Sequence, residues 1–174
     1  MHIRPLGRTG LEVSVLGFGA FKIGRNENVK FPSSYELPSE QEAIEIVHGM
    51  LDLGITLIDT APSYGLSEER LGRALEGRRD KVLLSTKVGE RFVDGVSSHD
   101  FSSTAAVKSL QESLRRLRTD HVDLLLVHSD GDDDAILADE SYIETLESFK
   151  DAGLTRAIGF SGKTPAGNLA ALAW

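Results

Sequence analysis

The chain has no cysteine, which excludes a disulfide framework, a thiolate nucleophile and a thiolate metal site. Basic residues are in deficit: 19 lysines and arginines against 27 aspartates and glutamates give a formal net charge of −8. This acidity argues against nucleic acid or an anionic membrane as the main partner. Long apolar runs of membrane-spanning length are missing, and residues 1–5 lack the apolar core of a signal peptide. Our default expectation is therefore a cytoplasmic protein.

What is present is an ordinary globular composition. Hydrophobic residues make up 40% of the chain and charged residues 26%, as in typical soluble domains. The length of 174 residues predicts a single domain over residues 1–174, long enough to bury a core. The acidic run 130–134 lacks the ligand order and distal glutamate of an EF-hand loop, and we assign no metal site.

Short apolar strands alternate with helical stretches. A β-hairpin is expected over residues 2–15, around a glycine-bounded turn. Buried strands are then expected near residues 15–18, 55–58, 82–85, 122–127 and 154–160. Helices are expected after the capping-box pattern at 39–42, over 66–75, 104–118 and 141–152, and after Thr164-Pro165. We expect loops over residues 21–38, 88–103 and 129–139.

This alternation predicts an α/β fold with a parallel sheet and right-handed crossovers. Periodicity alone does not distinguish a doubly wound sheet from a barrel. Gly17 and Gly19 stand at the end of the first strand, where glycine allows a ligand or another strand to approach closely. The third glycine of the dinucleotide fingerprint is replaced by Lys22, which disfavours a Rossmann fold.

Polar residues follow four consecutive strands: Asp59, Lys87, His128 and Ser161. Each alone is an ordinary solvated residue or turn former. The carboxyl ends of parallel neighbours meet at one rim, so we expect the four side chains to gather there. Tyr64 follows Asp59 by five residues, in the adjoining loop. An acid, an ammonium, an imidazole and a phenol at one rim are candidates for proton transfer.

The chemistry of this set is coherent. A nearby ammonium favours negative charge on a phenol oxygen, so Lys87 would support Tyr64 and Asp59 would orient Lys87. His128 would hydrogen-bond a substrate oxygen or relay a proton. The combination suits protonation of a carbonyl oxygen as it gains negative charge. Side chains cannot supply hydride, so a redox cofactor is required.

At this point the motifs resemble those of the aldo-keto reductase superfamily. The matching segments are residues 16–19, 57–65, 67–75, 85–87, 125–128 and 158–161. The resemblance runs from the hairpin to the last expected helix. It implies a (β/α)8 TIM-type barrel, incomplete in this chain, with the N-terminal β-hairpin across its bottom.

The resemblance also implies a function. It places a catalytic tetrad on Asp59, Tyr64, Lys87 and His128, with the phenol as general acid. The family interconverts aldehydes or ketones and alcohols with NADP(H), so we expect a small carbonyl or sugar-like substrate, with NAD(H) as the alternative cofactor. A second function stays open: a non-catalytic member that acts through binding, as the potassium-channel beta subunits do.

Cofactor contacts are expected at Ser161, Gly19 and Phe21. Ser161 matches a residue that holds the nicotinamide carboxamide; where the family often has asparagine next, this chain has Gly162. Three phenylalanines lie in loops that reach toward the rim, as either substrate-contacting or packing residues: Phe21, Phe31 and Phe92.

The length departs from the resemblance. A full barrel typically needs about 250 residues, and barrels place phosphate binding after strands seven and eight. Five expected strands would leave two sheet edges open, which favours self-association. Three explanations stay open: a fragment of a longer protein, which we favour, two copies paired through open edges, or a natural chain without activity. We expect weak or no NADPH binding by the 174-residue chain itself.

Overall fold

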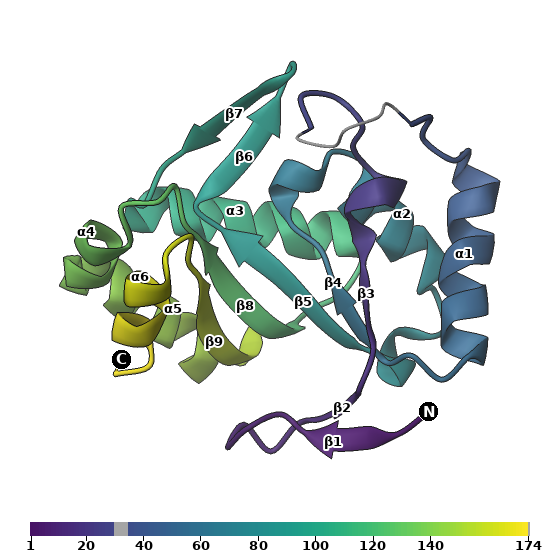
Figure 1. Ribbon diagram of the computed structural model, residues 1–174, viewed down its shortest axis with the longest axis horizontal. Coiled ribbons are helices and arrows are strands. Elements are labelled where there is room, and N and C mark those ends of the chain that lie inside the picture. Colours follow the sequence, from purple (N-terminus) through teal and green to yellow (C-terminus); the bar gives the residue numbers. More distant parts are fainter. Residues whose placement is uncertain (30–34, 174) are drawn as a thin grey trace.

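The central element is a five-stranded parallel sheet, shown in the computed structural model of Figure 1, which describes residues 1–29 and 35–173. Its strands are β3 (Gly17–Gly19), β4 (Leu57–Asp59), β5 (Leu83–Val88), β8 (Val122–His128) and β9 (Thr155–Ser161). Neighbours in the sheet follow one another in the order β3-β4-β5-β8-β9. The sheet is therefore wound in one direction, as in a barrel and unlike a doubly wound sheet.

The five expected strands exist, but their ends lie further along the chain. The strand expected at 82–85 continues to Val88. The strands expected at 55–58, 122–127 and 154–160 end at Asp59, His128 and Ser161. Backbone pairing such as His128 with Ser161 keeps these polar residues in the ladder. The first strand was expected to be buried and is not: it is the edge strand β3, and the preceding Leu16 is 57% exposed.

Helices cover one face of this sheet. They are α1 (Glu40–Asp52), α2 (Ser67–Ala74), α3 (Ser103–Leu117), α4 (Asp133–Ala138), α5 (Glu140–Asp151) and α6 (Pro165–Ala171). The main core joins apolar residues of α1, α2, α3 and α5 to the sheet residues Ile58, Leu84 and Val127. The predicted capping box at Ser39 and the predicted N-cap at Thr164 are both confirmed.

Alternation along β5 explains how one strand serves both core and site. Leu84, Thr86 and Val88 face the helices, where Thr86 donates a hydrogen bond to the buried Glu68 of α2. The residues between them face the other way, where Ser85 and Lys87 both contact Asp59. The apolar and polar layers of the molecule therefore follow from the period of two.

The predicted N-terminal hairpin is confirmed as β1 (Ile3–Pro5) and β2 (Glu12–Ser14). It lies below the end of the sheet where the strands begin (Figure 1). Leu11 and Val13 form a second small core with Leu83 of β5. The hairpin thus fills the interior at the end opposite the candidate site.

All three of the expected loops contain some regular structure. Residues 88–103 include an antiparallel hairpin of β6 (Glu90–Val93) and β7 (Val96–His99), which rises above the upper end of the sheet (Figure 1). Its turn, Asp94 and Gly95, has positive φ at both positions, the geometry that Asp-Gly favours. Residues 129–139 include α4, because Asp132 caps that helix. Residues 21–38 begin with the 3-10 turn η1 (Ala20–Ile23), and the expectation for Phe31 lies outside the described residues.

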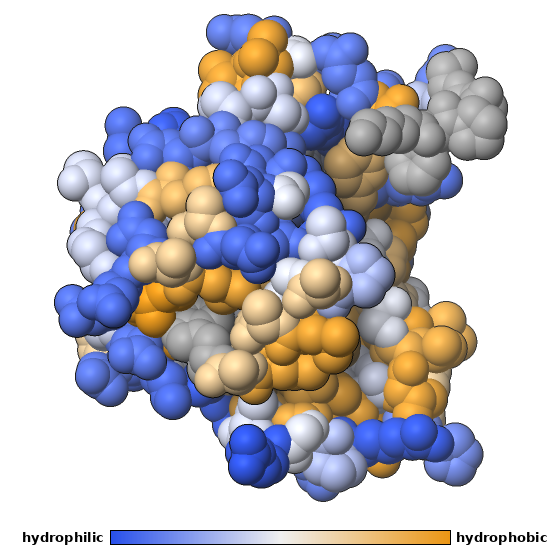
Figure 2. All heavy atoms as spheres, turned by 60° about the vertical axis from the view of Figure 1, so that its left-hand side comes forward, coloured by the Kyte–Doolittle hydropathy of each residue, from blue (hydrophilic) through white to orange (hydrophobic). Residues whose placement is uncertain are grey.

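The sheet has open edges. Within the described ranges, β3 and β9 each pair with one strand of this sheet. Apolar surface lies among hydrophilic residues on the side that carries β9 and α6 (Figure 2), where Leu169 and Leu172 are 68% and 81% exposed. No helix in the described part of the chain is both long and apolar enough to span a membrane.

Candidate active site

The carboxyl ends of the strands carry the expected polar residues. Asp59, His128 and Ser161 are the last residues of β4, β8 and β9, and Lys87 is the second-last residue of β5. Tyr64 ends the 3-10 turn η2 (Pro62–Tyr64), directly after β4. The structure brings all of them to one end of the sheet.

Lys87 is the centre of the closest cluster. Its Nζ lies 2.7 and 2.8 Å from the two carboxylate oxygens of Asp59 and 3.2 Å from the hydroxyl oxygen of Tyr64. It also donates to the backbone carbonyl of Thr60, at 2.9 Å. Only 5% of the Lys87 side chain is exposed, so its charge is balanced by Asp59 and not by water. The cluster holds an ammonium directly beside a phenol oxygen.

Two glycines let the backbone carry Tyr64 to this place. An added Cβ at Gly24 would lie 2.1 Å from the carbonyl oxygen of Tyr64, and one at Gly65 would lie 2.4 Å from the carbonyl oxygen of Gly24. Gly65 also has a φ of 60°, which residues with side chains rarely adopt. The carbonyl of Gly24 accepts a hydrogen bond from Leu66 at 3.0 Å. The turn with Tyr64 is thus packed backbone to backbone against the end of η1.

His128 stands on the other side of Tyr64. The two ring centroids are 6.1 Å apart and the rings are nearly perpendicular. The Nδ1 atom of His128 lies 2.9 Å from Oε2 of Glu90 and 3.4 Å from Oγ of Ser63. These contacts occupy Nδ1 and leave Nε2 as the ring nitrogen for another partner.

Glu90 has the most informative electrostatics of the group. Burial raises its pKa, but hydrogen bonding and charge from His128, with hydrogen bonds from Ser97 and Ser63, lower it more, to about 2. Glu90 is therefore a carboxylate at neutral pH and can only accept hydrogen bonds.

The expected cofactor residues lie around this cluster. Gly19 pairs with Asp59 across β3 and β4, and, apart from Gly19 and its chain neighbours, no described residue has an atom within 4 Å of the position that a Cβ would take. Phe21 packs edge-on against Tyr64, with ring centroids 5.0 Å apart. Ser161 pairs with His128 in the sheet. The backbone of Gly162, next in the chain, is bound by the side chain of Asn168.

Comparison with known proteins decides the family. The model of the aldo/keto reductase family matches residues 15–172. The chain belongs to this family. Its fold is accordingly of the TIM-barrel type, α/β and incomplete in this chain, as its parallel five-stranded sheet also indicates.

Curated aldo-keto reductases match over about half of their own length. The aldo-keto reductase YhdN of Bacillus subtilis is 36% identical over 165 residues, which cover 92% of this chain and 47% of YhdN. L-galactose dehydrogenase of Arabidopsis thaliana is 38% identical over 169 residues, which cover 93% of this chain and 49% of that enzyme. The chain thus spans about half the length of these relatives.

Solved structures of aldo-keto reductases superimpose closely. A protein of Pseudomonas aeruginosa described as an aldo-keto reductase has a TM-score of 0.88 and 48% identity, over 97% of this chain and 63% of that one. An aldo-keto reductase from Bacillus halodurans in its holo form has a TM-score of 0.80 and 38% identity, over 95% of this chain and 51% of that one. The chain therefore has the fold of the family over nearly all of its length.

Sequence reasoning missed the partners of His128 in this aldo-keto reductase site. Glu90 and Ser63 lie in segments that were expected to be plain loops. Arg25 was also missed: its guanidinium donates to the carbonyl of Ser63 at 3.0 Å and stacks on the ring of Phe92, 3.4 Å from the ring centroid. The Asp94-Gly95 dipeptide was the one sequence signal that would have indicated a hairpin beside the site.

Proposed function

We propose that the whole protein is an NADP(H)-dependent oxidoreductase that interconverts aldehydes or ketones and alcohols, with Tyr64 as the general acid and base. The observation that carries this proposal is the position of Lys87 Nζ, 2.7 Å from Asp59 and 3.2 Å from the Tyr64 oxygen. Membership of the aldo/keto reductase family supports it. We also propose that residues 1–174 form one domain, the N-terminal portion of the barrel.

Tyr64 performs the proton transfer in this mechanism. Its hydroxyl donates a proton to the carbonyl oxygen of the substrate as that oxygen gains negative charge. The ammonium of Lys87, 3.2 Å away, stabilises the phenolate that remains, and Asp59 holds the ammonium in place with both oxygens. In the reverse direction the same phenolate accepts the proton of the alcohol.

His128 orients the substrate oxygen. Because Nδ1 is occupied by Glu90 and Ser63, the ring uses Nε2 for this contact. The short distance between the rings of His128 and Tyr64 lets both reach one oxygen atom. This geometry favours a single reacting oxygen held between the phenol and the imidazole.

The residues present fit a nicotinamide ring beside this cluster. Phe21 packs against Tyr64, Ser161 pairs with His128 in the sheet, and Gly19, which pairs with Asp59, has no side chain to fill the space beside it. We assign Ser161, Gly19 and Phe21 to hold the nicotinamide end of the cofactor. When bound, NADP(H) or NAD(H) supplies or accepts the hydride that no side chain can provide.

The names of related proteins suggest a class of substrate. Relatives are named L-galactose dehydrogenase, D-threo-aldose 1-dehydrogenase and methylglyoxal reductase, and their names refer to sugars or a small dicarbonyl. We propose a small carbonyl or sugar-like substrate for this protein too.

The test is turnover by the full-length protein. NADPH or NADH oxidation is measured with an activated aromatic aldehyde, methylglyoxal and several aldoses, and NADP+ reduction with the corresponding alcohols. We expect NADPH-dependent reduction of at least the aromatic aldehyde. NADPH binding without turnover on any of these compounds would contradict an oxidoreductase and favour the non-catalytic binding role.

A further inference from the structure

Glu90 is a largely buried acid that contacts His128 and that the proton-transfer cluster does not use. It is the first residue of β6, and 13% of its side chain is exposed. Its Oε2 atom lies 2.9 Å from Nδ1 of His128, and Ser63 and Ser97 also donate hydrogen bonds to its carboxylate. Such a shell of donors holds the carboxylate in one orientation.

The charge state of Glu90 determines where the imidazole proton lies. An ionised carboxylate has no proton to donate, so Nδ1 of His128 must be the donor in this pair. The neutral imidazole then carries its proton on Nδ1, and Nε2 presents a lone pair. The tautomer of neutral His128 is therefore set by Glu90, which belongs to β6 and not to the Lys87 cluster.

The backbone brings Glu90 to His128 in a way that few sequences permit. Gly89 has a φ of 108°, and a Cβ there would lie 2.6 Å from the ring of Phe101 and 3.2 Å from the carbonyl oxygen of His128. The chain therefore leaves β5 through a glycine that lies directly against the end of β8. Glu90, the next residue, is directed to the imidazole by this turn.

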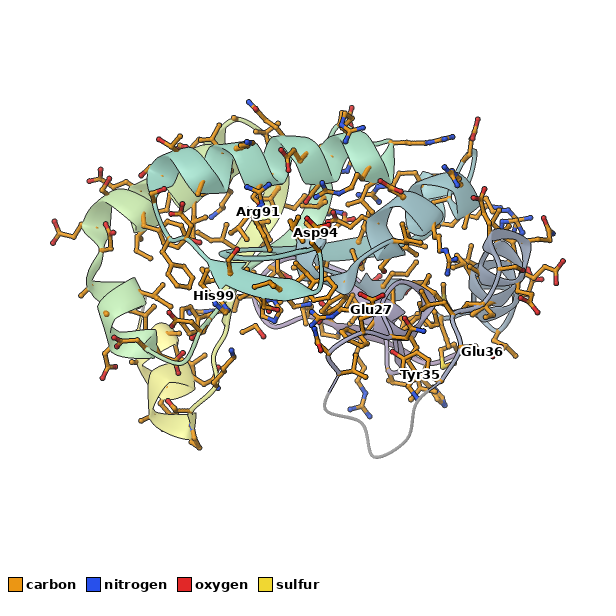
Figure 3. All side chains as sticks on the ribbon, turned by 90° about the horizontal axis from the view of Figure 1, so that it is seen from above. Glu27, Tyr35, Glu36, Arg91, Asp94 and His99 are labelled. Carbon is orange, nitrogen blue, oxygen red and sulfur yellow. The ribbon has the colours of Figure 1, made fainter. Side chains whose placement is uncertain are left out.

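The β6–β7 hairpin is held from its far side as well. Asn28 donates a hydrogen bond to the carbonyl of Gly95 in its turn, and the guanidinium of Arg25 stacks on Phe92. Seen from above, the hairpin with Arg91 and Asp94 lies beside the segment that carries Glu27 (Figure 3). Glu90 is thus part of a supported element and not of a free loop.

We propose that Glu90 is a positioning residue for carbonyl reduction: it fixes His128 with the proton on Nδ1 and leaves Nε2 to the reacting oxygen. This inference rests on the proposed function. Among the residues that the structure describes, the titratable groups in contact with His128 include Glu90 from β6 and Tyr64 from η2, and Arg25 acts on Glu90 from beyond the end of η1. With its Nδ1 proton bound by Glu90, protonated His128 donates a hydrogen bond from Nε2 to the reacting oxygen, and the one hydroxyl proton of an alcohol remains for Tyr64.

The first test observes the imidazole directly and needs no turnover. Nitrogen-15 NMR of histidine-labelled full-length protein reports which ring nitrogen carries the proton, and the signal that disappears in His128→Gln is assigned to His128. At a pH where His128 is neutral, we expect the Nδ1-protonated form in wild type and a shift toward the Nε2-protonated form in Glu90→Ala. Glu27→Ala, which removes a carboxylate from the adjoining segment, serves as the control and keeps the wild-type signal. An Nε2-protonated His128 in wild type, or the same signal in Glu90→Ala, would overturn the proposal.

The second test is kinetic. Glu90→Ala is expected to lower kcat/KM for the carbonyl substrate roughly ten- to a hundredfold, as losing the partner behind a functional histidine commonly does, with NADPH affinity unchanged within about twofold. Glu90→Gln keeps an oxygen that accepts from Nδ1 and is expected to fall between Glu90→Ala and wild type. Wild-type kcat/KM in Glu90→Ala would contradict the positioning role. If wild type itself shows no turnover, the proposed function fails, while the NMR result still decides the role of Glu90.

Discussion

A lysine side chain that is 5% exposed is stable in a protein only when its three donors are satisfied. Lys87 meets this condition with Asp59 and the Thr60 carbonyl, and the Tyr64 oxygen lies within the same shell. Removing Asp59 would leave a buried ammonium without its counter-ion, which is far more costly than losing a surface ion pair. The Lys87–Asp59 ion pair therefore stabilises the fold, in addition to its role in the proposed proton transfer.

Glu90 makes the stability of the fold depend on pH. Its pKa falls from 4.5 to about 2 on folding, so its contribution is fully present above pH 4.5 and is lost as the pH falls toward 2. We expect Glu90→Gln to be less stable than wild type at pH 6, by at most about 3 kcal/mol, and to approach it near pH 2. Urea unfolding at a series of pH values measures this difference. A gap that stays constant from pH 6 to pH 2 would show that the ionised carboxylate contributes nothing.

The sequence predicted the residues at the strand ends better than it predicted their partners. Asp59, Lys87 and His128 each follow an apolar run, and the local pattern is enough to place them at one rim. Their roles stay predictions. Glu90 and Ser63 could not be found in this way, because a hydrogen bond to His128 depends on how two distant segments fold over it.

Among the elements, the β6–β7 hairpin differs most from the sequence-based expectation. Apolar and polar residues alternate only weakly along its strands, and β7 is exposed throughout. The sequence pattern therefore gives little indication of strands there. The helices behaved differently: capping at Ser39 and Thr164 marks their starts by local hydrogen bonds. Strand ends were misplaced because pairing with a neighbour, and not local polarity, decides where a strand stops.

Gly24, at the end of η1, packs against the turn that holds Tyr64. In Gly24→Ala the new methyl group meets the Tyr64 carbonyl, so the turn must move and the phenol with it. We expect kcat to fall by about tenfold or more, since misplacing a reacting group by about 1 Å has effects of this size or larger. Gly49→Ala is the matched control: outside the backbone of its own helix and its chain neighbours, no described residue has an atom within 4 Å of a Cβ there, and turnover is expected to stay at the wild-type level. Full activity in Gly24→Ala would show that the turn tolerates displacement.

Tyr142 of α5 has a buried hydroxyl group without a hydrogen-bond partner among the described residues. The side chain is fully buried, and its oxygen has no hydrogen-bond partner among the residues that the structure describes. Burial, with the charges of Asp100 and Asp139, raises the pKa of this phenol. We expect Tyr142→Phe to be as stable as wild type or more stable by about 1 kcal/mol, because a buried unsatisfied hydroxyl is costly. A loss of 2 kcal/mol or more in denaturant unfolding would reveal a bond to this oxygen.

For the whole molecule, the order of the sheet distinguishes the alternatives that periodicity left open. The order β3-β4-β5-β8-β9 keeps chain neighbours adjacent, and β1–β2 fills the interior at the lower end. Sequence periodicity predicted the parallel α/β class, whereas the barrel came from the resemblance, because strand order is a property of tertiary packing. The open edges at β3 and β9 agree with a chain that spans about half of its curated relatives.

Cofactor affinity of the 174-residue chain follows from this architecture. Barrels bind phosphate after strands seven and eight, and this chain contributes five strands to its sheet. We expect NADPH fluorescence titration to show weak or no binding to the 174-residue chain, and tighter binding to the full-length protein. Micromolar binding by the 174-residue chain would mean that Gly19, Phe21 and Ser161 belong to a self-sufficient site.

In the proposed mechanism, Tyr64, supported by Lys87 and Asp59, donates the proton during carbonyl reduction. The most direct measurement is single-turnover oxidation of bound NADPH by an activated aromatic aldehyde in the full-length protein, followed by stopped flow for wild type and Tyr64→Phe. We predict that Tyr64→Phe slows this step by about 10²-fold or more while NADPH affinity stays nearly unchanged. Hydride transfer in Tyr64→Phe at the wild-type rate would contradict the role of Tyr64 as general acid.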